Sequence, residues 1–395
     1  PLAFHSRKIG LSSNGSKIGI NAGAKLTGRV GPLGIGVLGM GLDDFENLDS
    51  DEVFVGRFTY DLFEESKVGT IFTHGDPQSN LNNQLAGVDL NLRSSNWWNE
   101  QSVSWHGFYM TSDDENENSD DVIGTHFTFP NYPFRASGHW VRTGENFNPA
   151  LGFVRRRGGE STGLGFTYYF EQPENELLED ISVGAEYDRY EWLDGDLDSD
   201  ELEINLIGIR TLAGDFLGLE VEFERDILQE PFEIIDEVII PSSEYKGIDF
   251  ELEFRSSSNR PIFGEFEIAY GHFYGGKATN AEIDLSWRPS KYFQLDFEIA
   301  STMARLPQNN FEVLTSSTGF RITPTTQLSF NGIAQYDNQS KTIGLNTRFR
   351  YIIKPGSDLF LVLNKGFDRG DDGQLRNFRT FKTEAIAKLG WIFQF

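Results

Sequence analysis

The sequence predicts an all-β fold, a single large antiparallel transmembrane β-barrel of about 22 strands. Three observations predict it: the alternation of apolar and polar residues, the length of the alternating segments, and connectors that are alternately short and long along the chain. In "KGIDFELEF" (residues 246–254) large apolar side chains fall on one face of an extended chain and carboxylates on the other. The same alternation recurs in "LGLEVEFE" (217–224) and "YFQLDFEIA" (292–300).

The length of these segments separates a membrane barrel from a soluble sandwich, in which strands also alternate. Most segments run about 10–15 residues, whereas sandwich strands typically have about 5–6. A tilted transmembrane strand needs about 9–11 residues. The segment lengths therefore favour strands that cross a bilayer.

The connectors supply the third observation, because outer-membrane barrels join their strands by short periplasmic turns and long external loops. Short connectors lie at 30–32, 64–67, 131–134, 213–215, 288–291, 324–326 and 354–357. Longer, mostly acidic ones lie at 41–52, 111–121, 193–201, 228–244 and 368–377. Counting back from a periplasmic C-terminus gives about 22 strands, with the first within residues 1–9, the second beginning near Lys17, and both termini periplasmic.

The C-terminal stretch "AKLGWIFQF" fits a final strand of this kind. Trp391, Phe393 and Phe395 share one parity and are expected to be covered by lipid and the interfacial belt. A terminal Phe also resembles the ending that outer-membrane barrels present to their assembly machinery.

Composition excludes several function classes. The net charge of −26 repels a phosphate backbone, so no nucleic-acid partner is expected. With no cysteine in the 395 residues, disulfides, thiolate metal sites and cysteine catalysis are excluded. The first residues show neither an initiator Met nor a signal-peptide pattern, from which we expect that an upstream segment was removed.

Three stretches carry a resemblance to a known family: "PLAFHSRKIG" at the start, "GAKLTGRVGPLGIGVL" (23–38) and "GENFNPALGFVRRRG" (144–158). They resemble the outer-membrane barrel domain that follows a carbohydrate-binding-family-9-like module in many Gram-negative proteins. The resemblance implies a barrel over residues 1–395, with the periplasmic module absent from this chain. It also implies an outer-membrane location, with membrane lipid and lipopolysaccharide as partners.

If the apolar face meets lipid, the polar face lines a lumen, and between residues 201 and 298 that face is acidic. The carboxylates on the polar parity are Glu203, Glu220, Glu222, Glu224, Asp249, Glu251, Glu253, Glu265, Glu267, Glu282, Asp284, Asp296 and Glu298. Like charges on neighbouring strands destabilise a sheet, so this acidic wall is expected to need cations, water or a basic insert. Basic candidates on the polar parity of other strands are Arg57, Arg93, Arg348, Arg350 and Lys388.

A loop at 144–160 is the candidate constriction. We expect it to fold into the lumen as a plug built from Asn148, Pro149, Phe153, Arg155, Arg156 and Arg157. Guanidinium groups match carboxylates bidentately, so the three arginines are expected to pair with the acidic wall. The alternative is that these arginines form an exposed strand start or a patch facing lipopolysaccharide.

The acidic loops raise a calcium hypothesis. Asp194, Asp196, Asp198 and Asp200 alternate like the start of an EF-hand loop. The sixth position is Ser199 rather than Gly and the twelfth is Asn205 rather than Glu, which argues against a true EF-hand. Loose Ca²⁺ bridging in the external loops, including 113–121, stays open beside the simpler interpretation of solvated acidic loops, and no other cofactor is expected.

Two functions are expected from this fold, and a third is weighed against them. The first is a channel or transport pore with an acidic lumen narrowed by an inserted loop. The second is a non-conducting anchor, receptor or scaffold subunit of an outer-membrane or periplasmic protein assembly. A lumen hydrolase is the third: Ser104 and His106 share a parity, but no G-x-S-x-G or H-E-x-x-H motif is present. We therefore predict no enzyme, and interpret His106 and His139 as polar lumen or interface groups.

Overall fold

The computed structural model describes residues 1–114, 119–369 and 378–392. Strands account for 71% of the described residues, which form one antiparallel sheet of 21 strands and a separate two-stranded hairpin. The all-β prediction is thereby confirmed. The chain divides into two compact units, Pro1–Tyr169 with Gly184–Leu202, and Phe170–Val183 with Glu203–Phe395, and each is described by itself. No helix in the described residues is long and apolar enough to cross a membrane.

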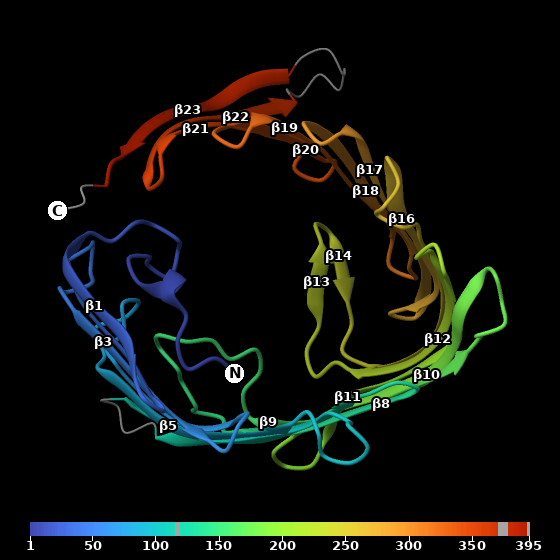
Figure 1. Cartoon of the computed structure of the whole chain (residues 1–395), viewed down its shortest axis with the longest axis horizontal. Coiled ribbons are helices and arrows are strands. Elements are labelled where there is room, and N and C mark those ends of the chain that lie inside the picture. Colours follow the sequence, from blue (N-terminus) through green and yellow to red (C-terminus); the bar gives the residue numbers. More distant parts are fainter. Residues whose placement is uncertain (115–118, 370–377, 393–395) are drawn as a thin grey trace. The chain divides into compact units, whose positions relative to one another are not determined.

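The first unit is an antiparallel series in which each strand pairs with the next along the chain (Figure 1). Its strands are β1 (Ile20–Val30), β2 (Leu33–Leu42), β3 (Glu52–Leu62), β4 (Ser66–His74), β5 (Asn83–Ser94), β6 (Val103–Asp114), β7 (Asp120–Pro130) and β8 (Phe134–Thr143). The strands β9 (Gly159–Glu171), β10 (Leu178–Trp192) and β11 (Leu197–Thr211) each contribute residues to both units.

The second unit continues the same antiparallel pattern. Its strands are β12 (Phe216–Ile227), β13 (Phe232–Ile235), β14 (Val238–Ile240), β15 (Glu244–Arg255), β16 (Ile262–Phe273), β17 (Gly276–Ser290), β18 (Phe293–Arg305), β19 (Asn310–Thr325), β20 (Leu328–Asp337), β21 (Thr342–Lys354), β22 (Ser357–Arg369) and β23 (Phe378–Gly390). Apart from the hairpin β13–β14, the sheet strands have 9 to 16 residues, the length that the alternation predicted for membrane-crossing strands.

The two faces of the sheet are inverted relative to a soluble protein. On β15, Ile248 and Phe250 are 47% and 54% exposed, whereas Asp249 and Glu251, which alternate with them, are partly buried. Most of the other sheet strands carry the same kind of exposed apolar side chains. Soluble monomers rarely expose a contiguous apolar surface of this extent. A lipid-facing strand requires this arrangement, apolar residues outward and polar residues on the opposite face.

The N-terminal segment departs from the prediction. Residues 1–19, all of them described, contribute no strand to the sheet and contain only a short 3₁₀ turn, Ser6–Lys8. Their apolar side chains, among them Phe4 and Ile18, pack in a protein cluster, and Leu2 bridges to Phe153. The expected first strand within residues 1–9 is therefore wrong, and the described sheet has 21 strands, an odd number and one below the expected count. Strand β1 instead begins beside Leu42, at the edge that carries the long connector 43–51.

The C-terminal strand ends earlier than the alternation indicates. β23 stops at Gly390, and the amide of Ile392 donates to Ser357 Oγ at 3.0 Å. Trp391 lies beyond the strand, with the Lys354 ammonium 4.7 Å from its ring centroid. Phe393 and Phe395 lie outside the described residues.

Neighbouring short connectors of the second unit are tied by one ion pair. Arg260 donates to both carboxylate oxygens of Asp215, and the amide of Ser257 donates to the same carboxylate at 2.9 Å. The hydrogen bonds from Arg260, followed by the one from Ser257, lower the pKa of Asp215 to about 2. The pair therefore remains charged at every pH at which the protein would work.

Candidate functional site

The connector between β8 and β9, residues 144–158, packs over the polar face of the first unit. Phe147 is fully buried against Leu85, Met110 and Val122, which come from β5, β6 and β7. These three residues share the parity of the polar face, yet all are apolar. The sequence thus places a hydrophobic patch where the inserted segment docks, and apolar burial holds the segment against the sheet.

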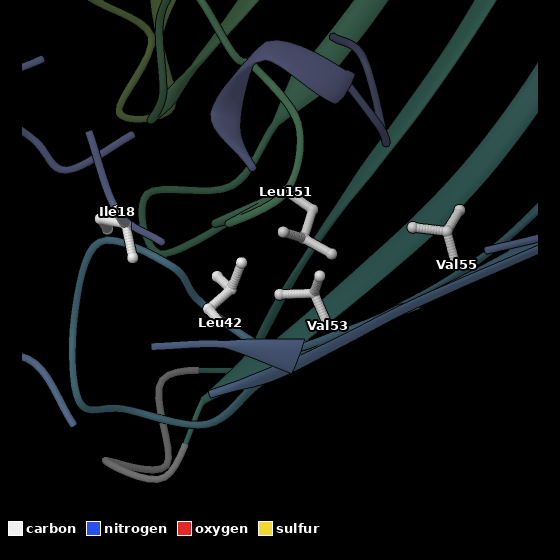
Figure 2. Packing of buried hydrophobic residues seen from close by; sticks show 5 residues of the cluster. All are labelled: Ile18, Leu42, Val53, Val55 and Leu151. Atoms are coloured by element: carbon white, nitrogen blue, oxygen red, sulfur yellow. The ribbon is translucent and has the colours of Figure 1, made fainter. Parts of the chain in front are cut away.

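A second anchor is Leu151, also fully buried. Figure 2 shows it beside Leu42, Val53 and Val55 of β2 and β3, with Ile18 of the N-terminal segment. Residues 1–19 and 144–158 therefore share one hydrophobic cluster on the polar face. This packing explains why the apolar residues of the N-terminal segment are not available for a lipid-facing strand.

Hydrogen bonds fix the loop between its two anchors. The amide of Asn148 donates to Ser112 Oγ at 2.8 Å, and Asn83 Nδ2 donates to the Asn148 carbonyl at 3.0 Å. Pro149 is fully buried. At Gly152 a side chain would collide with the backbone carbonyl of Leu2, so only glycine permits the crossing of the two segments.

The arginines of the loop do not pair with the acidic wall, although the sequence predicted that they would. Arg156 pairs with Asp198 at 2.5 Å rather than with a residue of the acidic wall, and its guanidinium lies 4.8 Å from the ring centroid of Tyr190. Arg157 donates to Asn148 Oδ1 at 2.9 Å, and Arg155 is exposed. Burial of Phe147 and Leu151, instead of bidentate ion pairs with the wall, positions the loop, because an exposed ion pair contributes little compared with a buried aromatic ring.

The residue Phe153 sits on the same loop and provides a contrast to Phe147. Its backbone pairs with Leu2, but its side chain is 54% exposed. We expect Phe147→Ala to lower the free energy of unfolding by about 3–5 kcal/mol, because it empties a fully buried site. Phe153→Ala should change it by less than about 1 kcal/mol. Reversible urea unfolding in lipid vesicles measures both, and equal losses would contradict the assigned anchor.

The four aspartates of the calcium hypothesis do not form one loop. Asp194 and Asp196 lie in the connector before β11, and Asp194 Oδ1 accepts the Asp196 amide at 3.0 Å. Asp198 and Asp200 belong to β11 itself, where alternation is the normal period of a strand. The pairing of Asp198 with Arg156 further separates it from the other three.

In the second unit, strands β12 and β15–β18 bring the predicted carboxylates into register on one face. Glu253, Glu267 and Glu282 lie directly opposite one another on β15, β16 and β17. A second row joins Glu265, Asp284 and Glu298 on β16, β17 and β18. Glu220 faces Glu251, and Glu222 faces Asp249, across β12 and β15. We call the first two sets the carboxylate rows.

Among the described residues of the second unit, few cations balance this face. Arg255 pairs with Glu253 and, through Nη2, with Glu265 Oε1 at 2.8 Å. Neutral donors serve other members: Asn205 donates to Glu220 at 3.2 Å and Ser317 to Glu298 at 3.0 Å. Ligand oxygens of Glu282, Asp284 and Glu298 all lie within 4.8 Å of one another. So dense a set of like charges creates a strongly negative local potential that attracts cations.

The basic residues predicted to balance the wall have closer partners. Arg57 of β3 pairs with Asp89 of β5. Arg93 lies 3.5 Å from Glu65. Arg350 donates to Asp358 at 2.8 Å. The remaining two lie near Phe360: the Arg348 guanidinium is 4.6 Å from its ring centroid, and Lys388 is its cross-strand partner. Arg57, Arg93 and Arg350 therefore neutralise local carboxylates that do not belong to the acidic wall.

A second inserted segment was missed by sequence reasoning, which took residues 228–244 for an external acidic loop. Its hairpin β13–β14 folds over the polar face, where Val238 and Ile240 are buried against Ala278, Ala304 and Leu306 (Figure 1). The detectable signal was the run "FEIIDEVII" (232–240), which is too apolar for a solvated loop.

The residues weighed for hydrolysis do not form a nucleophile–base pair. Ser104 Oγ lies 2.5 Å from Thr128 Oγ1, and His106 stacks on Phe108 and His126. A triad requires the nucleophile within hydrogen-bond reach of its base. The geometry of Ser104 therefore gives no support to a hydrolase site.

Comparison with known proteins identifies the fold. No protein-family model and no curated protein matches the chain. Among solved structures, a ferric enterobactin receptor of Pseudomonas aeruginosa matches with a TM-score of 0.56 and 8% identity, over 90% of this chain and 72% of that one. A siderophore receptor of Acinetobacter baumannii matches with a TM-score of 0.53 and 9% identity, over 90% and 73%.

A third match, the ferric preacinetobactin receptor of Acinetobacter baumannii, has a TM-score of 0.53 and 9% identity over 92% of this chain and 76% of that one. At these identities the likeness concerns the fold alone. The chain has the all-β sheet architecture of outer-membrane receptor barrels.

Proposed function

We propose that this protein is an outer-membrane transport barrel whose acidic lumen is narrowed by two inserted segments, 144–158 and 228–243. One observation carries the proposal: an exposed apolar face is backed by a polar face on which carboxylates lie in rows. The exposed apolar side chains suit membrane lipid and lipopolysaccharide, and the similar receptor structures support a location in the outer membrane of a Gram-negative bacterium.

The passage favours cations and polar neutral solutes. Rings of carboxylates select cations by attracting them and by repelling anions from the same surface. Each carboxylate row has three members in succession across three strands, so a cation leaving one carboxylate meets the next at cross-strand distance. Transfer between several weak sites permits passage, whereas one tight site would retain the ion.

The resemblance to the barrel that follows a carbohydrate-binding-family-9-like module belongs to the same proposal. In its most specific stretch, residues 144–158, two residue types are required by the structure. Asn148 forms hydrogen bonds with Ser112 and Asn83, and Gly152 leaves room for the backbone of Leu2. These requirements explain why a family with this inserted segment would share the motif.

A non-conducting anchor or scaffold subunit of an outer-membrane assembly is the second candidate. The observation that favours it is the same pair of inserted segments, because buried anchors such as Phe147 and Ile240 hold them against the sheet. Segments docked by fully buried residues open rarely. Conduction therefore decides between the two functions.

Single-channel recording in planar bilayers is the deciding experiment. Purified protein, checked for folding by its heat-modifiable migration, is added under a KCl gradient. The transport proposal expects discrete conductance steps whose reversal potential lies closer to the equilibrium potential of K⁺ than to that of Cl⁻. Heat-denatured protein is the control. Folded protein that gives no steps would support the anchor, and anion-selective steps would contradict the acidic lumen.

A further inference from the structure

Three of the six histidines of the chain stand in one row on the first unit. His106, His126 and His139 lie directly opposite one another on β6, β7 and β8. Their rings stack, with centroids 6.2 Å apart between His106 and His126 and 5.6 Å between His126 and His139. The interplanar angles are 27° and 23°. We call these three residues the histidine row.

The histidine row lies on the polar face and is open to solvent. It shares the parity of Met110 and Val122, the residues that hold Phe147 of the inserted loop. His126 is exposed, and His106 and His139 are half-buried. Phe108 stacks on His106 and His126 and also belongs to the cluster beneath the loop. The row therefore borders the inserted segment, where a small ion can reach it.

A glycine on the next strand brings a carboxylate to this row. Asp188 of β10 lies 3.8 Å from Nε2 of His139, although β9 runs between their strands. Any Cβ at Gly163 of β9 would collide with both the His139 ring and the Asp188 carboxylate. Ser161 Oγ lies 3.1 Å from the same Nε2. The absence of a side chain at Gly163 thus allows a carboxylate and a hydroxyl to orient the imidazole.

We propose that the histidine row binds a divalent transition-metal ion of the Zn²⁺, Ni²⁺ and Cu²⁺ class. Imidazole nitrogens are the common ligands of these ions, whereas Mg²⁺ and Ca²⁺ take oxygen ligands. His126 and His139 are the ligating pair, because their rings are the closest of the row. His106 is the next imidazole along the row. Asp188 is a positioning residue that acts through His139 in the manner of carboxylate–histidine–zinc sites.

This site goes beyond the proposed transport function and differs chemically from the carboxylate rows. Those rows present only oxygen ligands and belong to the other unit. Binding is measured on the protein in detergent, so its outcome is independent of whether the protein conducts. A failure of the metal site would leave the transport proposal intact, and the converse also holds.

Titration calorimetry of the full chain without a histidine tag tests the site. Zn²⁺ is added in the presence of excess Mg²⁺. We expect one site per chain, and an increase in Kd of more than about tenfold for His126→Gln combined with His139→Gln. Asp188→Asn should raise Kd by about tenfold, the lower end for a partner that orients a ligand. A matched control, His5→Gln at an exposed histidine outside the row, should bind like the wild type.

A spectroscopic readout keeps the proposal testable if the double variant folds poorly. Electron paramagnetic resonance of bound Cu²⁺ should show nitrogen couplings, and the single variant His126→Gln, at an exposed position, should lose one of them. Wild-type affinity in the double variant, competition by Mg²⁺, or a Cu²⁺ spectrum without nitrogen coupling would each overturn the proposal.

Discussion

Replacing Glu253, Glu267 and Glu282 together by glutamine removes most of the cation preference of the pore. The three carboxylates form one row across β15, β16 and β17, and among the described residues Arg255 is the one cation in an ion pair with a member. A wall lined by one sign of charge sustains potentials of several kT, so we expect the cation-to-anion permeability ratio to fall by roughly tenfold. Reversal potentials under a KCl gradient measure the ratio.

The matched control for this variant neutralises three exposed carboxylates in connectors, Glu46, Glu64 and Glu174. Both variants change the net charge equally, so only position distinguishes them. The control should retain the wild-type ratio, particularly at high salt, where screening shortens the reach of distant charges to about 3 Å at 1 M. An equal fall in both variants would assign selectivity to overall charge rather than to the row.

Neutralising a carboxylate row should also leave the sheet folded. Like charges directly opposite on neighbouring strands destabilise pairing, by roughly 0.2–1 kcal/mol per pair. Glu253 and Glu267 make one such pair, and Glu267 and Glu282 another. Their retention despite this cost is consistent with a role in passage. A loss of selectivity in the variant therefore cannot be attributed to unfolding.

The strands of the 21-stranded sheet were predictable because their alternation is a local pattern. On β15, Ile248, Phe250 and Leu252 alternate with carboxylates over 12 residues, a length typical of membrane-crossing strands. Such a pattern depends on local periodicity and on which solvent covers each face. Position and face could therefore be assigned without knowing any partner strand.

The surfaces on which the inserted segments dock are not displayed locally by the sequence. Leu2 and Phe4 alternate like a strand, but their partners are Phe153 and the cluster around Leu151, about 150 residues away. In 228–244 the acidic residues suggested solvent, although the apolar run 232–240 already indicated burial. Which surface covers Val238 and Ile240 is decided by Ala278 and Ala304 on the facing strands.

For the functional residues, too, the sequence predicted the face on which they lie but not their neighbours. Parity alone placed Glu253 and Glu282 on the polar face, but their alignment into rows required the register of β15, β16 and β17. The histidine row was invisible for the same reason, because His126 and His139 are paired by register and not by spacing. Arg156 illustrates a further limit: charge indicates that a carboxylate partner exists, whereas geometry selects Asp198.

Removing the hairpin β13–β14 is expected to have a large effect on conductance. Replacing residues 229–242 by a short Gly-Ser linker should raise the single-channel conductance by about twofold or more, because the hairpin covers polar-face positions around Ala278 and Ala304. Strands β12 and β15 pair over their full lengths without it, so the sheet should survive the deletion. Conductance in symmetric KCl is the measurement.

Two isoleucines of the hairpin sharpen this experiment. Ile240 is fully buried, whereas its neighbour Ile239 is 57% exposed. Ile240→Ser places an unpaired hydroxyl in the docking interface, which should weaken docking by about 2–5 kcal/mol and produce frequent openings to the conductance of the deletion variant. Ile239→Ser makes the same chemical change outside the interface and should have the conductance and opening frequency of the wild type. If deletion leaves the conductance unchanged, the hairpin does not narrow the path; if both serine variants open alike, docking through Ile240 is not what closes it.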